Sequence, residues 1–354
     1  MPFLAFGTPL RFAAWLTTSG GRHSALLRGL LQAGDATPLC CVASYKPYTN
    51  REVAVRSPLP VLFLMLFLLT TTVFPVAASP SPSADFPPYG PDLRERLCAP
   101  DPTYNLKEGE FLLPVFLYHF VGRETLERNG HSVSRFNVTA ADFEAQLALL
   151  RALGYHPVTV GEIAAAMDGK ATLPERPVAL TFDDGWREQY DVAFPVLQRY
   201  GMRATFFVST SFVGYPRFMT WEELAEMRDA GMEIASHGRK HVNLADADDP
   251  DAWREIARSR ETLEKKLGVS AASFAYPFGG YRKGLPAMLE RAGYQIAVGL
   301  GSSPVVRPGG RYYLRRIEVR GQDTLMVFLN RLPWRGMGTP LCTPGHRERT
   351  REEQ

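Results

Sequence analysis

The chain has 354 residues, of which 45% are hydrophobic and 22% charged. This balance is typical of globular proteins and excludes wholesale disorder, collagen-like and coiled-coil architecture, while the length predicts one large domain or two smaller ones. The formal net charge is +3, and residues 1–78 carry six basic and only two acidic side chains. The rest of the chain is therefore nearly neutral. Because a nucleic-acid-binding domain needs a basic face on its folded part, we expect no nucleic-acid partner.

An uncharged apolar run spans residues 59–78, follows Arg51 and Arg56, and precedes a Pro/Ser-rich stretch that we interpret as a linker over 79–109. This order is typical of a secretory signal with cleavage near Val76-Ala77-Ala78. The run is also long enough to be an uncleaved transmembrane anchor. A buried core helix is a third interpretation, which the adjacent threonines and Pro75 disfavour. Either of the first two predicts a secreted or membrane-anchored, extracytoplasmic protein.

Residues 1–58 show no sustained periodicity, and we interpret them as a poorly defined leader, or as a sign that translation starts later. The four cysteines, Cys40, Cys41, Cys98 and Cys342, lack the spacing of metal ligands. Cys98 and Cys342 flank the expected exported domain. They could form a disulfide that joins its ends, or stay as two free thiols; the sequence leaves both open.

From residue 113 onward, strand-like apolar runs alternate with helix-like segments. The runs are 113–118, 177–182, 204–209, 232–236, 273–276, 294–300 and, more weakly, 312–319. Helices are expected from Thr139 onward and over 187–200, 221–230, 250–267 and 283–292, several of them followed by a glycine suited to a helix C-terminus. Repeated β–α units predict an α/β fold with a mainly parallel sheet, open or closed into a barrel. We place this domain at 110–331, followed by a polar tail at 332–354.

Polar residues cluster where four of these strands end. Asp183 and Asp184 follow 177–182, His237 and His241 follow 232–236, His119 follows 113–118, and a Gly-rich turn follows 273–276. The carboxyl ends of parallel strands share one face of the sheet, where such folds build their sites. Alone, the aspartates could form a solvated turn, the histidine pair could be unrelated residues, and His119 could be a core histidine. Their coincidence at four strand ends favours a site.

The residue types suggest hydrolysis of an amide. Two imidazoles and one carboxylate leave an open position on a divalent ion such as Zn²⁺. Such an ion lowers the pKa of water and polarises a carbonyl. The second carboxylate could then act as general base, and a further histidine could protonate the departing amine.

Three segments carry a resemblance to a known family: TFDDG at 181–185, SHGRKH at 236–241 and FAYPFGGY at 274–281. Together they resemble the polysaccharide deacetylase domain (NodB homology, carbohydrate esterase family four). The resemblance implies a distorted (β/α)7-type, NodB-like barrel. It implies that Asp183 is the general base and that Asp184, His237 and His241 bind the metal, with Zn²⁺ expected and Co²⁺, Ni²⁺ or Fe²⁺ as alternatives.

Two departures from the family pattern stand out. The usual Arg-x-Pro-Tyr motif reads Ala275-Tyr276-Pro277-Phe278, so the arginine that would support the catalytic aspartate is missing there. Arg316 could reach in instead, and the Phe278 backbone N–H could still serve an oxyanion. The usual C-terminal Leu-x-His motif occurs instead near the front, as 117–119. This resembles the circularly permuted branch that includes poly-N-acetylglucosamine deacetylases, and implies His119 as general acid.

Three aromatic residues complete the candidate set. Trp186 and Tyr281 could stack on sugar rings or simply pack at the barrel rim, and Tyr276 could support the site or the substrate. The function expected is a metal-dependent N-deacetylase acting on a polysaccharide such as poly-N-acetylglucosamine, peptidoglycan or a chitin-like polymer. The alternatives are an esterase that removes O-acetyl groups, another C–N hydrolase on this scaffold, and a non-catalytic envelope glycan-binding protein. Nothing in the sequence indicates an oligomeric state.

Overall fold

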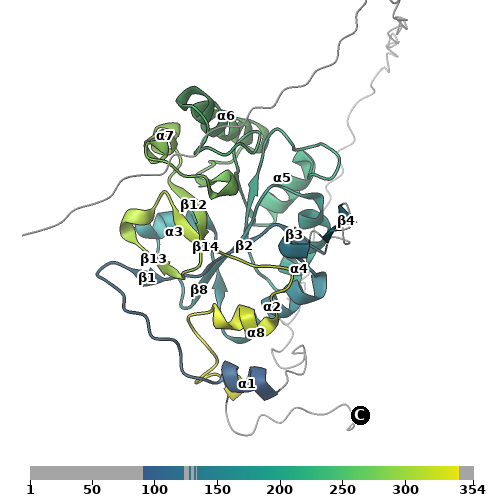
Figure 1. The fold of residues 1–354 in the computed structure, drawn as a ribbon, viewed down its shortest axis with the longest axis vertical. Helices are drawn as coiled ribbons and strands as arrows, with labels where there is room; N and C mark the ends of the chain where they lie inside the picture. Colours follow the sequence, from purple (N-terminus) through teal and green to yellow (C-terminus); the bar gives the residue numbers. More distant parts are fainter. Residues whose placement is uncertain (1–90, 123–126, 129–130, 133, 343–354) are drawn as a thin grey trace, which may run out of the picture. The chain divides into compact units, whose positions relative to one another are not determined.

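The computed structural model describes residues 91–122, 127–128, 131–132 and 134–342 (Figure 1). The apolar run at 59–78 and the leader lie outside this range. Among the described residues, no helix has the length and apolar character needed to cross a membrane.

Seven parallel strands close into a barrel within the described chain. Strand β2 pairs with β14 on one side and with β8 on the other, which closes the ring. In order around the barrel the strands are β2 (Val115–Tyr118), β14 (Leu314–Glu318), β12 (Ile296–Gly301), β11 (Ser273–Ala275), β10 (Glu233–Ser236), β9 (Thr205–Val208) and β8 (Pro177–Phe182). This confirms the predicted (β/α)7-type barrel, and each of these strands coincides with one of the seven predicted runs.

Short strands lie outside the ring. They are β7 (His156–Pro157), which pairs with the start of β8, and the pairs β1 (Phe111–Leu112) with β13 (Val305–Val306), β3 (Phe120–Val121) with β6 (Asn137–Val138), and β4 (Glu127–Arg128) with β5 (His131–Ser132).

Helices surround the barrel in Figure 1. They are α1 (Pro91–Leu97), α2 (Ala140–Ala152), α3 (Val160–Met167), α4 (Phe194–Arg199), α5 (Trp221–Asp229), α6 (Asp249–Leu267), α7 (Leu285–Ala292) and α8 (Leu325–Asn330). A π-helical turn, η2 (Gln189–Ala193), leads into α4. As predicted, α2 begins after Thr139, whose Oγ1 accepts a hydrogen bond from the backbone N–H of Asp142.

Alternation along each strand separates two kinds of core. On β8, Val178, Leu180 and Phe182 pack outward under the helices, whereas Ala179 faces an inner cluster with Val115 of β2. The same alternation continues to the carboxyl ends of the strands. Inward-facing polar side chains at these ends therefore lie at the mouth of the barrel.

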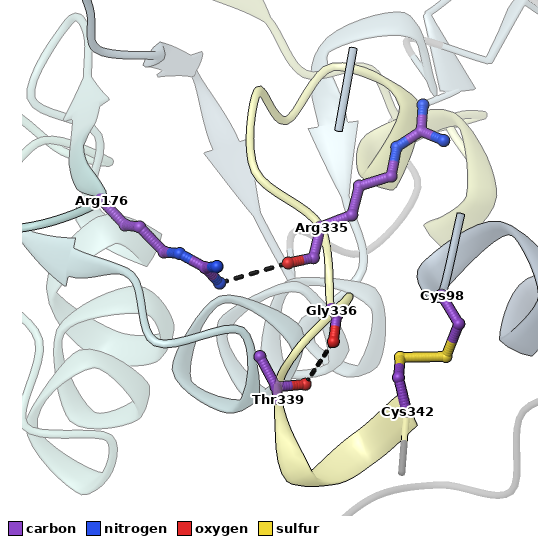
Figure 2. The surroundings of a disulfide bond; sticks show 6 residues. All are labelled: Cys98, Arg176, Arg335, Gly336, Thr339 and Cys342. Carbon is purple, nitrogen blue, oxygen red and sulfur yellow. Dashed lines mark hydrogen bonds between the residues drawn. A yellow bond between two sulfur atoms is a disulfide. The ribbon is translucent and has the colours of Figure 1, made fainter. Parts of the chain in front are cut away.

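Packing continues on both sides of the predicted 110–331 domain, whose limits stay a prediction. Leu97 and Leu332 are both buried. Cys98 and Cys342 form a disulfide across 244 residues of sequence (Figure 2). Nearby, Arg176 donates a hydrogen bond to the carbonyl of Arg335. Of the two alternatives that the sequence left open for this cysteine pair, the structure contains the bonded one.

Candidate active site

Three predicted metal ligands lie together at the mouth of the barrel. Asp184 follows β8, while His237 and His241 follow β10, and one ligand atom from each lies within 4.8 Å of the others. The Oδ1 atom of Asp184 is 3.1 Å from Nε2 of His241 and 3.5 Å from Nε2 of His237. One carboxylate oxygen and two imidazole nitrogens thus face a common point.

The hydrogen bonds of these residues suit a divalent cation. His237 donates from Nδ1 to the carbonyl of Ala275 at 2.9 Å, which leaves the lone pair of Nε2 directed toward the cluster. Asp184 Oδ1 is buried and, although it lies close to Nε2 of His241, it accepts no hydrogen bond of acceptable geometry in the described structure. Because a buried polar atom without a partner is costly, a cation at this point would satisfy it. The donor set therefore fits a three-ligand metal site.

Backbone strain is concentrated at the same place. Five described non-glycine residues have positive φ, and three of them are Asp184 (77°), His241 (56°) and Phe278 (59°). Such conformations cost free energy and persist where the surrounding structure enforces them, commonly at functional sites. Asp184 is thus in the left-handed conformation, directly after Asp183 at the end of β8, and its carboxylate faces the two histidines.

Arg316 holds the other carboxylate of the pair. Its Nη1 and Nη2 donate to Oδ1 and Oδ2 of Asp183 at 2.6 and 2.7 Å, a bidentate pair. Arg316 lies on the inner face of β14 and is fully buried. Its Nε donates to the carbonyl of Gly299, and its Nη1 also donates to Thr181 Oγ1. The family motif has an arginine at the position of Ala275 on β11. In this chain the guanidinium that binds Asp183 comes instead from Arg316 on β14.

The electrostatics keep both carboxylates charged. Burial raises the pKa of Asp183, but Arg316 and the nearby imidazoles outweigh burial and hold that pKa below its ordinary value. For Asp184, burial is likewise outweighed, here by the close contact with His241 and by the charges of the other histidines, and its pKa is also lowered.

The pKa values of His237 and His241 shift in opposite directions. Burial lowers the pKa of His237 despite the facing aspartates, so its imidazole is kept neutral, as a metal ligand must be. Burial also opposes protonation of His241, but the contact with Asp184 prevails and raises the pKa. These directions describe the site without a cation.

His119 follows β2, and its ring lies 5.0 Å from that of Phe136. Its Nδ1 is buried and has no hydrogen-bond partner among the described residues. The charge of its imidazole contributes to lowering the pKa values of Asp183 and Asp184, which places the ring in their electrostatic neighbourhood.

The candidate aromatic residues occupy different positions. Trp186 donates from Nε1 to Oδ2 of Asp184 at 2.8 Å, and its ring stacks on Phe218 at 4.3 Å. Phe278 is 64% exposed and its ring contacts that of His241. Tyr281 is 46% exposed, whereas Tyr276 is buried beneath it. The substrate could therefore reach Phe278 and Tyr281, but not the ring of Tyr276.

Two buried residues of the site carry no sequence motif. Glu255 of α6 accepts hydrogen bonds from the backbone N–H groups of Arg239 and Lys240, and so holds the loop between the two histidines. Gln189 donates to the carbonyls of His119 and Asp183. Glu255 and Gln189 lie on helical segments that contain other polar residues, so only the tertiary structure reveals which of these residues make such contacts.

Comparison with known proteins agrees with this arrangement. A family model described as polysaccharide deacetylase matches residues 170–297, a range that includes Asp183, Asp184, His237 and His241 but neither His119 nor Arg316.

Curated relatives extend the similarity beyond that range. The Bacillus subtilis protein YxkH, whose name places it among polysaccharide deacetylases, is 30% identical over 207 residues, which cover 58% of this chain and 71% of YxkH. A poly-β-1,6-N-acetyl-D-glucosamine N-deacetylase of Staphylococcus aureus is 26% identical over 240 residues, covering 62% of this chain and 82% of the relative.

A solved structure shares the fold. The Streptococcus pyogenes deacetylase PplD, determined in complex with acetate, is similar with a TM-score of 0.59 at 24% identity, covering 63% of this chain and 98% of PplD. The barrel, the Asp-His-His cluster at its mouth and the extent of the match with YxkH lead to the same conclusion: this chain belongs to the polysaccharide deacetylase family.

Proposed function

We propose that this protein is an extracytoplasmic, metal-dependent enzyme that removes N-acetyl groups from a polysaccharide of N-acetylated amino sugars. The observation that carries the proposal is the meeting of Asp184, His237 and His241 beside an ionised, arginine-bound Asp183. A glycan-binding module has no need of three convergent ligands next to a separate buried carboxylate.

Asp184, His237 and His241 would hold the cation, and Zn²⁺ suits two imidazoles and one carboxylate best, with Co²⁺, Ni²⁺ and Fe²⁺ as alternatives. When bound, such a cation supplies Lewis acidity, which makes water more acidic and an amide carbonyl more electrophilic.

The chain's own residues supply the proton transfers. Asp183 accepts the proton of the attacking water; Arg316 keeps this carboxylate ionised and fixes the direction of its oxygens. The backbone N–H of Phe278 donates to the oxyanion of the tetrahedral intermediate. His119 then gives a proton to the nitrogen as the C–N bond breaks. The products are acetate and a free amino sugar.

Two features support an N-acetylated glycan as substrate. The Staphylococcus aureus relative is named for N-deacetylation of poly-β-1,6-N-acetyl-D-glucosamine. In this chain, Phe278 and Tyr281 present exposed rings next to His241 and above Tyr276, and aromatic faces of this kind can pack against sugar rings. Peptidoglycan and chitin-like oligomers are the other polymers to compare.

The disulfide supports an extracytoplasmic location, since disulfides persist in oxidising compartments and are rare in the cytosol. The apolar run at 59–78 would serve as signal or anchor, and it lies outside the described residues.

A panel of glycans tests the proposal. Poly-N-acetylglucosamine, peptidoglycan, chitin oligomers and an O-acetylated glycan are incubated with the protein, with and without a chelator, and freed amines and acetate are measured. We expect amine and acetate in equal amounts from at least one glycan, and neither with the chelator. Acetate without amine from an O-acetylated glycan would identify an esterase instead, and no release from any glycan would contradict the proposal.

A further inference from the structure

A buried side-chain amide connects the strand ends that carry the proposed base and acid. Gln189 is fully buried and is the first residue of the π-helical turn η2. Its Nε2 donates to the carbonyl of Asp183 at 2.6 Å and to the carbonyl of His119 at 2.8 Å. Both hydrogens of this one amide group are thus used, each on a different strand end.

The position of these carbonyls explains why a side chain is needed. The β2–β8 ladder ends with Tyr118 opposite Phe182, followed by a last bond from the Asp183 N–H to the Tyr118 carbonyl. Buried backbone carbonyls need a donor. Gln189 provides it for both carbonyls beyond the ladder and thereby extends the connection between β2 and β8 by one step.

The local backbone delivers Gln189 to this point. It lies six positions after Asp183, and the turn it starts is π-helical, a wide and uncommon conformation that is often found at functional sites. This turn brings the side-chain amide of Gln189 within hydrogen-bond distance of the ends of both β2 and β8.

We propose that Gln189 is a positioning residue that sets the distance and orientation between the base Asp183 and the acid His119. This inference rests on the proposed function. Gln189 acts through two backbone carbonyls, and its two donated hydrogen bonds do not reach the side chain of any candidate metal ligand. Its loss should therefore change the chemical step more than metal binding.

The matched test compares two buried glutamines in the full chain. Gln189→Met keeps the length of the side chain and removes both donated hydrogen bonds. Gln146→Met is the control: Gln146 is buried on α2 and its side chain accepts a hydrogen bond from Tyr118 Oη at 2.8 Å, whereas the two carbonyls are bound by Gln189. Thermal unfolding, Zn²⁺ affinity, KM and kcat are measured for both variants on a glycan that the wild type deacetylates.

We expect Gln189→Met to lower kcat roughly 10- to 100-fold, with KM and Zn²⁺ affinity changed less than threefold, whereas Gln146→Met keeps kcat near the wild-type value. Combined with His119→Gln, the Gln189 substitution should cost less than it does alone, because part of its effect passes through His119. If the loss of kcat in the double variant equals the product of the two single-variant losses, the proposal is overturned.

If Gln189→Met does not fold, Gln189→Asn replaces it, because asparagine keeps the amide but is one methylene too short to reach both carbonyls. Wild-type kcat in either folded variant overturns the inference, as does an equal loss of kcat in the Gln146 control. Absence of deacetylation by the wild type would instead reject the proposed function, so the two failures are distinguishable.

Discussion

Asp183 is the residue on which the proposed chemistry depends most. It is buried, ionised and held by two hydrogen bonds from Arg316, and it does not belong to the cluster of metal ligands. A carboxylate in this position can accept a proton from water without leaving its place. A change at Asp183 should therefore separate proton transfer from metal binding.

Asp183→Asn tests that separation. The amide keeps the shape but cannot act as a base, so we expect kcat to fall at least about 100-fold, while the metal content of the protein stays that of the wild type. Acetate release at the wild-type rate would show that Asp183 is not the base.

Arg316→Met tests the support of Asp183. Removing one partner of a buried ion pair leaves an uncompensated charge, and we expect about 3–5 kcal/mol of lost unfolding free energy at pH 7. Without Arg316, burial raises the pKa of Asp183, so protonation in the folded state becomes favourable as pH falls. The loss should therefore shrink between pH 7 and pH 4.5.

Urea unfolding of the metal-free variant at both pH values measures this effect. Arg331→Met is the control, because Arg331 pairs with Asp323 away from the site. A loss that stays constant with pH would contradict the electrostatic role of Arg316.

At the scale of elements, the seven barrel strands could be predicted because each is an apolar run bounded by a turn or glycine. Helix α3 (Val160–Met167) was not predicted, although Thr159 and Glu162 form a capping box that marks its start.

Alternation along 314–319 predicts that one of two adjacent arginines points into the barrel, but the sequence does not indicate which one. In the structure Arg316 is buried in the barrel and Arg315 is exposed. Contacts such as those of Gln189 depend on the meeting of separate elements.

The loop after β8 supports the metal site through Trp186. Trp186→Phe keeps the stacking on Phe218 and removes the hydrogen bond to Asp184 Oδ2. Because such partners orient metal ligands, we expect Zn²⁺ affinity to fall roughly 10-fold or more, measured by titration against a chelating indicator. Trp221→Phe, on α5, should leave the affinity unchanged; equal affinity in both variants would contradict this role.

At the scale of the whole molecule, the disulfide joins the two ends of the packed region. Replacing Cys98 and Cys342 together by serine releases a loop of 244 residues and should reduce the unfolding free energy by about 2–5 kcal/mol. Because the bond lies near Leu97 and Gly336 rather than at the mouth of the barrel, kcat below the melting temperature should not change. Unaltered stability in the double variant would contradict a stabilising role.

The site at the mouth of the barrel could be predicted from the sequence, whereas the disulfide between the two ends of the packed region could not. The motif residues predicted a site because strand ends in a parallel barrel converge. The pairing of Cys98 with Cys342 stayed open because sequence separation does not report distance.

The most direct test of the account is the metal content of the purified protein. We predict close to one divalent ion per chain in the wild type, and its loss in both His237→Gln and His241→Gln, while Asp183→Asn retains it. Equal metal content in the wild type and the two histidine variants, or none in any of them after reconstitution with Zn²⁺, would contradict a cation held by Asp184, His237 and His241.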